Sequence, residues 1–76
     1  MAPAIKLKAR EQRMLAVLYA PGATVAYGLG AGDELHRRGL VMPTSKKRWE
    51  ITAEGRLAIE GYPQLLASYK RAINVA

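Results

Sequence analysis

The sequence contains no cysteine and no phenylalanine, and its acidic residues are half as numerous as its basic ones. The lack of cysteine excludes disulfide frameworks, thiolate zinc sites and thiol nucleophiles. No stretch reaches the roughly 18 consecutive apolar residues that a membrane span needs, and residues 1–10 lack the long apolar run of a signal peptide. We therefore expect a cytoplasmic protein that is stabilised by packing or oligomerisation and has no membrane partner.

The chain has 76 residues, which is enough for one domain with one modest core. Half of the residues are hydrophobic, so a packed core is expected rather than disorder. Twelve Lys and Arg against six Asp and Glu give a formal net charge of +6. This excess favours a polyanionic partner such as DNA, RNA or an acidic protein. We expect one domain over residues 1–76, with residues 1–5 as a loose tail.

Apolar periodicity predicts a first helix over about residues 6–19, which Pro21 and Gly22 bring to an end. A short helix is predicted from Gly32 to Arg38, since acidic residues begin it and arginines end it. The glycine-rich stretch 23–32 has room for a turn but not for a long helix.

Residues 40–52 predict a β-hairpin, with strands at 40–42 and 48–52 and a turn at 43–47. Trp49 and Ile51 alternate with charged residues, so their side chains are expected in the core rather than against a nucleic-acid base.

Two helices are predicted after the hairpin. Thr52 is a good N-cap for the first, which weakens at Gly61. Pro63 begins the last one, residues 63–74, whose apolar stripe includes Leu65, Leu66, Tyr69 and Ile73. Either this last helix or the first one offers a surface for a homodimer.

Two motifs frame the predicted hairpin: His36–Val41 reads HRRGLV, and Ile51–Leu57 reads ITAEGRL. The first resembles the exit from the recognition helix, and the second the entry into the helix after the wing, in winged helix-turn-helix domains of MarR-like regulators. The resemblance implies a small winged helix, α+β and mainly α, with a two-stranded wing hairpin and C-terminal helices. It further implies binding of double-stranded DNA by a prokaryotic or phage transcriptional regulator or a small phage accessory factor.

The chain differs from this family between the first helix and the HRRGLV motif. Residues 21–35 are too few for two helices and a turn, so the second helix must be shortened or lost. Helix docking in the major groove, which depends on that helix pair, is weakened accordingly.

Basic residues gather around the hairpin, and no acidic residue occurs between Glu34 and Glu50. Such side chains would make salt-sensitive phosphate contacts from a wing, although a merely solvated hairpin is the alternative. The candidate nucleic-acid contacts are Arg37, Arg38, Lys46, Lys47 and Arg48.

Additional candidate contacts are His36, Tyr27 and Arg13. For Tyr27, a lid over the core is an equal alternative. Asp33 and Glu34 are expected to stabilise the start of their helix rather than to read bases.

The sequence does not predict an enzyme. The Gly28-x-Gly30-x-Gly32 pattern lacks the Lys-Ser/Thr of a phosphate-binding loop and is expected to be a tight connection. Asp33 with His36 is a poor metal-ligand set, and no nucleophile, base and orienting partner converge. We expect no cofactor and no metal.

DNA binding would make the protein nucleoid-associated. Two further hypotheses remain beside it. One is a protein-interaction module whose basic face binds an acidic protein. The other is RNA binding, for which the sequence lacks interleaved exposed aromatic residues.

Overall fold

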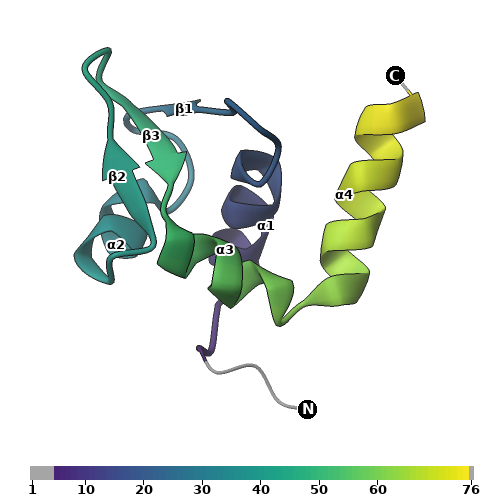
Figure 1. Cartoon of the computed structure of the whole chain (residues 1–76). Helices are drawn as coiled ribbons and strands as arrows, with labels where there is room; N and C mark the ends of the chain where they lie inside the picture. The colour runs from purple at the N-terminus through teal and green to yellow at the C-terminus, as the bar shows by residue number, and fades with distance from the viewer. Residues whose placement is uncertain (1–4, 76) are drawn as a thin grey trace.

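The chain folds in the order helix, strand, helix, hairpin, helix, helix (Figure 1). The structure, a computed structural model, describes the backbone of residues 5–75 and the side chains of residues 5–69. The predicted class, α+β and mainly α with a hairpin and C-terminal helices, is confirmed. The elements are α1 (Ala9–Leu18), β1 (Val25–Ala26), α2 (Gly32–Arg37), β2 (Val41–Pro43), β3 (Arg48–Ile51), α3 (Ala53–Glu60) and α4 (Pro63–Val75).

The sheet has three antiparallel strands in the order β1-β3-β2. The predicted hairpin is β2 and β3, in which Val41 pairs with Ile51. The third strand was not predicted, because its two residues are too few to show an alternating pattern. Val25 opposes Trp49, so β1 exists as a strand because β3 supplies its hydrogen-bonding partner.

The core lies between α1, α2, the sheet and α3, and its fully buried side chains include Leu15, Leu35 and Ile59. Trp49 is 6% exposed, so its predicted place in the core is confirmed. Helix α4 stands beside α1 at the edge of the molecule (Figure 1) and packs through Leu66. The predicted stripe on α4 also includes Ile73, whose side chain lies outside the described residues.

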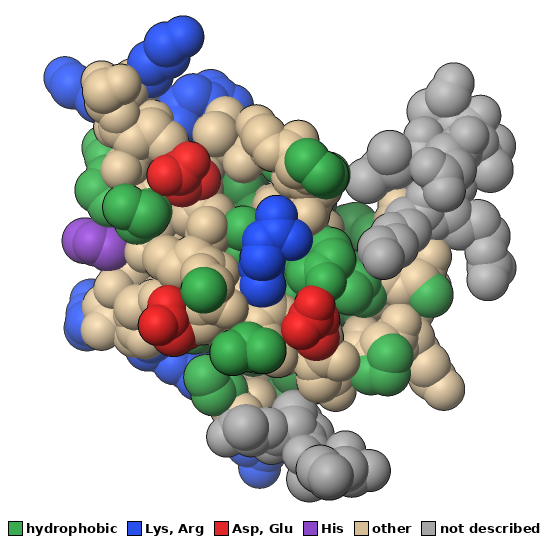
Figure 2. Space-filling view, in the orientation of Figure 1, with side chains coloured by type: hydrophobic (Ala, Val, Ile, Leu, Met, Phe, Trp, Pro, Cys, Tyr) green, Lys and Arg blue, Asp and Glu red, His purple; other side chains and the backbone are tan. Residues whose placement is uncertain are grey.

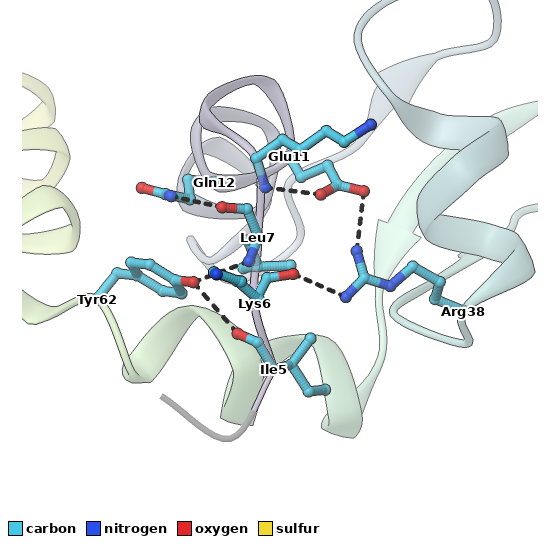
Figure 3. Close-up of polar contacts among 8 residues, drawn as sticks. Ile5, Lys6, Leu7, Glu11, Gln12, Arg38 and Tyr62 are labelled. Atoms are coloured by element: carbon cyan, nitrogen blue, oxygen red, sulfur yellow. Dashed lines mark hydrogen bonds and ion pairs between the residues drawn. The ribbon is translucent and has the colours of Figure 1, made fainter. Parts of the chain in front are cut away.

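Helix α1 begins at Ala9, three residues later than predicted, because other groups bind the preceding backbone. Tyr62 Oη accepts from the Leu7 N–H at 2.8 Å and donates to the Ile5 carbonyl at 3.2 Å (Figure 3). The Gln12 amide donates to the Leu7 carbonyl at 2.8 Å. Of the expected tail, residues 1–4 lie outside the described part, whereas Ile5 packs against the core.

Glu11 is the one buried charged side chain among the described residues, at 2% exposure. Its carboxylate accepts the Lys8 N–H at 2.8 Å and so caps α1, and it pairs with Arg38 Nη1 at 3.0 Å (Figure 3). Arg38 Nη2 also donates to the Lys6 carbonyl at 2.9 Å. This pair therefore joins the end of α2 to the start of α1.

The base of the hairpin is closed by the two sequence motifs, which contact each other. The Thr52 N–H donates to the Leu40 carbonyl at 3.1 Å, and Thr52 Oγ1 donates to the Gly39 carbonyl at 2.7 Å. The same hydroxyl accepts the Gly55 N–H at 3.0 Å, as an N-cap does. A Cβ at Gly55 would lie 2.1 Å from the Leu40 carbonyl oxygen, so only glycine fits there.

We expect Gly55→Ala to lower the free energy of unfolding by about 1–3 kcal/mol, because the added methyl group overpacks the contact between α3 and the Leu40 carbonyl. Ala53→Gly, in the exposed first turn of the same helix, is the control and should cost about 1 kcal/mol or less through helix propensity. Urea unfolding of both variants measures the difference. If Gly55→Ala is no worse than the control, the close packing of α3 against the Leu40 carbonyl is wrong.

Candidate nucleic-acid interface

The tip of the β2–β3 hairpin projects from the helical body (Figure 1). Thr44 organises it: its N–H donates to the Arg48 carbonyl at 2.7 Å, and its carbonyl accepts the Lys47 N–H at 3.2 Å. The Thr44 hydroxyl also accepts the Lys46 N–H at 3.2 Å. The three residues between Thr44 and Arg48 form a hairpin loop whose last residue is left-handed, a geometry in which glycine is usual. Here that residue is Lys47, with a φ of 58°.

Lys46 and Lys47 are both exposed at this tip. Figure 2 shows Lys and Arg side chains gathered where the hairpin projects. The tip therefore presents two cations on a short, hydrogen-bonded loop that stands clear of the helices.

Two of the three arginines in the predicted cluster, Arg48 and Arg38, bind groups within the chain. Arg48 is half-buried; its Nε donates to Thr24 Oγ1 at 2.7 Å and its Nη2 to the Thr24 carbonyl at 3.2 Å. Arg38 is held by Glu11, as described above. Arg37, by contrast, is exposed and has no side-chain hydrogen bond or ion pair to any described residue. The structure thus divides the five predicted contacts into three cations with no side-chain partner among the described residues and two arginines that bind groups within the chain.

The face that α3 presents is less basic. Asp and Glu side chains lie over α3 and the hairpin strands in Figure 2, and α3 itself carries Glu54 and Glu60. Tyr19 donates a hydrogen bond to Glu60, which raises the pKa of Tyr19 above its usual 10.0. Arg56 lies over the Tyr19 ring, 4.9 Å from its centroid. This face is therefore a poor surface for phosphates.

Helix α2, the next element after β1, has six residues and carries Asp33 and Glu34 in its first turn. No helix precedes it between residues 19 and 31, so the second helix that the family pattern expects is absent from this part of the chain. The start of α2 instead packs closely against Trp49, since a Cβ at Gly32 would lie 2.1 Å from Trp49 Nε1. Exposed His36 lies on the same indole, with ring centroids 5.1 Å apart.

The indole of Trp49 also supports Tyr27, whose ring centroid lies 4.7 Å away. Tyr27 is 43% exposed. Its ring therefore covers Trp49, as the lid alternative predicts, and the exposed part of the ring leaves a contact with a partner as a prediction.

Arg13 lies away from the hairpin tip, in an open groove of about 330 Å³ between α1 and the segment around β1. Arg10 lines the same groove and donates from Nη2 to the Gly30 carbonyl at 3.2 Å. Arg10 was not among the candidate contacts predicted from the sequence. Arg10, Arg13 and Val17 follow the i, i+3, i+7 spacing of one helix face, which could have linked them. The groove is lined by Arg10, Arg13, Met14, Val17, Val25 and Gly30.

No known protein family, curated protein or solved structure matches the chain. In the described part of the chain, no three His, Asp or Glu side chains are grouped so that they could bind a metal. None of the helices found within residues 5–75 combines the length and apolarity that crossing a bilayer requires.

Arg37→Ala and Arg38→Ala remove the same charge from adjacent positions but should differ in stability. We expect Arg38→Ala to lower the free energy of unfolding by about 1–3 kcal/mol, because it leaves the Glu11 carboxylate buried without its cation; the 37% exposure of Arg38 keeps the loss below that of a fully buried pair. Arg37→Ala should stay within about 0.5 kcal/mol of the unmodified chain. Denaturant unfolding measures both, and equal losses would contradict the structural role of Arg38.

Proposed function

We propose that this chain is a winged-helix-type module that binds double-stranded DNA through its hairpin tip, as a transcriptional regulator or a small phage accessory factor in the cytoplasm. The observation that carries the proposal is the projecting tip with its two exposed lysines, Lys46 and Lys47. Cations on a protruding hairpin reach phosphates that a flat surface cannot, and each phosphate contact releases counterions from DNA.

The backbone of Lys47 supports a functional role for its side chain. A φ of 58° is uncommon for any residue except glycine and costs about 1 kcal/mol or more. Glycine would relieve this strain in the same hairpin loop. A lysine there, exposed and directly beside a second lysine, is consistent with selection for charge rather than for stability.

The arrangement of the elements also supports the proposal. The HRRGLV and ITAEGRL motifs meet at the hairpin base, where the resemblance to winged helices implies that the wing begins and ends. The carboxylates at the start of α2, Asp33 and Glu34, would repel phosphates. The module we propose therefore binds the DNA backbone with little base readout from α2, and Arg37 at the other end of that helix adds a further cation.

Replacing both Lys46 and Lys47 by Ala should weaken binding to two unrelated duplexes equally and reduce the slope of log K against log salt by roughly 2, about one per phosphate contact. A slope change of that size means that, relative to the unmodified chain, the variant loses as much as about 100-fold more affinity at 0.1 M salt than at 1 M salt. The readout is a fluorescence anisotropy titration at several salt concentrations.

The matched control replaces Lys6 and Lys8 by Ala, which removes the same number of charges. Both lysines are exposed and lie in the segment before α1. The control should retain most of the affinity and slope. Equal losses of affinity in the two double variants would show that the effect comes from net charge alone and would contradict DNA binding by the hairpin tip. A wild-type chain without measurable DNA affinity at low salt would overturn the proposal and leave an acidic protein as the partner to test.

Lys47→Gly should separate stability from binding at a single position. Glycine relieves the positive φ, so we expect the free energy of unfolding to rise by about 0.5–1 kcal/mol after the greater entropy of the unfolded chain is counted. The same change removes one phosphate contact and should reduce the salt slope by about 1. Lys46→Gly, at a position without positive φ, should reduce the slope without the gain in stability. Unchanged DNA binding by Lys47→Gly would show that the lysine serves another purpose.

A further inference from the structure

Tyr27 occupies the corner of a tight turn beside the hairpin. The Leu29 N–H donates to the Ala26 carbonyl at 3.3 Å, and Gly28 supplies the positive φ of 85° that the third position of a type II turn requires. The Tyr27 N–H donates to the Lys47 carbonyl at 3.4 Å. The turn is therefore joined by its backbone to the loop that carries the exposed lysines.

The Tyr27 ring is supported from inside the protein. Its neighbour Trp49 is only 6% exposed, and Trp49 is itself held against the backbone of Gly32. The ring centroids of Tyr27 and Trp49 are 4.7 Å apart with an interplanar angle of 38°. Tyr27 nevertheless keeps 43% of its surface exposed. A second aromatic ring can therefore stack on Tyr27, whose own position is already fixed by Trp49.

Apolar and cationic groups flank the segment that carries this ring. Leu29, two residues further along the turn, is 60% exposed. On one side lies the hairpin, since Arg48 binds Thr24 just before β1. On the other lies α1, since Arg10 binds the Gly30 carbonyl at the end of the turn. Segment 24–30 thus runs between the lysines of the hairpin tip and the groove that Arg10 and Arg13 line.

We propose that Tyr27 is a stacking platform for an unpaired nucleobase, with the flanking phosphates bound by the hairpin lysines on one side and by Arg10 and Arg13 on the other. Aromatic rings interleaved with cations are what proteins use to bind unpaired nucleic acid, since every base has a π-face. The unpaired base belongs to a single strand or to an unpaired position in a duplex. The inference rests on the proposed function for its choice of DNA as the polyanion.

Four DNA ligands of equal length test this proposal: a thymidine oligonucleotide, an abasic oligonucleotide with the same phosphates, a paired duplex, and a duplex with one unpaired thymidine. We expect the thymidine strand to bind about 5- to 150-fold more tightly than the abasic strand, which is the range for stacking one base. Binding should also change the fluorescence of Trp49, the only tryptophan in the chain. Preference for the single strand or for the unpaired duplex then identifies the source of the base.

Variants of Tyr27 provide the control. Tyr27→Ala should abolish the preference for thymidine over abasic DNA while leaving abasic affinity unchanged, and Tyr27→Phe should keep the preference, because the ring suffices for stacking. Phe also preserves the packing on Trp49, so it guards against a folding defect, which circular dichroism would detect. Equal binding of thymidine and abasic strands, or a preference that survives Tyr27→Ala, would overturn the proposal.

The two proposals fail separately. If the wild-type chain shows no preference for thymidine, the effect of the hairpin lysines on duplex binding is untouched, and only the stacking role of Tyr27 is refuted. Conversely, if replacement of Lys46 and Lys47 leaves duplex affinity unchanged while Tyr27→Ala still removes the base preference, the hairpin proposal is refuted and the platform stands.

Discussion

The contact of Thr52 with the end of α2 is the interaction on which the rest of the structure depends. The Thr52 hydroxyl accepts the Gly55 N–H, which caps α3, and donates to the Gly39 carbonyl. The Thr52 backbone N–H donates to the Leu40 carbonyl. The exit from α2, both hairpin strands and the start of α3 are therefore joined at one point. Because the hairpin emerges from this joint, these hydrogen bonds orient its base, while the bonds of Lys47 to Tyr27 and of Arg48 to Thr24 hold it against the β1 segment nearer its tip.

The parts of the fold that sequence reasoning predicted are those that local chemistry determines. Glycine after a helix, threonine before one and alternation along a strand act over a few residues, so α2, the hairpin and α3 could be placed closely. The start of α1 and the strand β1 could not be, because distant groups decide them. Tyr62 binds the backbone of residue 7 from 55 residues away, and β1 depends on pairing with β3.

The basic cluster shows the same limit at the level of the site. Neighbours in sequence point in different directions: successive residues at a helix end are rotated by about 100°, and successive strand residues lie on opposite faces. Arg37 and Lys47 consequently reach solvent while Arg38 and Arg48 bind groups within the chain. Charge counted along the sequence indicated an exposed cationic hairpin tip but could not separate exposed cations from structural arginines, since Glu11 and Thr24 lie more than 20 residues away from the arginines that they hold.

The absence of a helix from residues 19–31 affects the way in which Trp49 is packed. With no helix in residues 19–31, the indole is covered instead by the backbone of Gly32 on α2 and by the ring of Tyr27. A start of α2 packed this closely against a core side chain is constrained in how it can approach a groove, and its acidic first turn opposes phosphates. The same packing brings an aromatic ring to the surface next to the hairpin. The exposed lysines of the hairpin tip and the ring of Tyr27 therefore lie on the sheet and its loops, whereas the start of α2 is acidic.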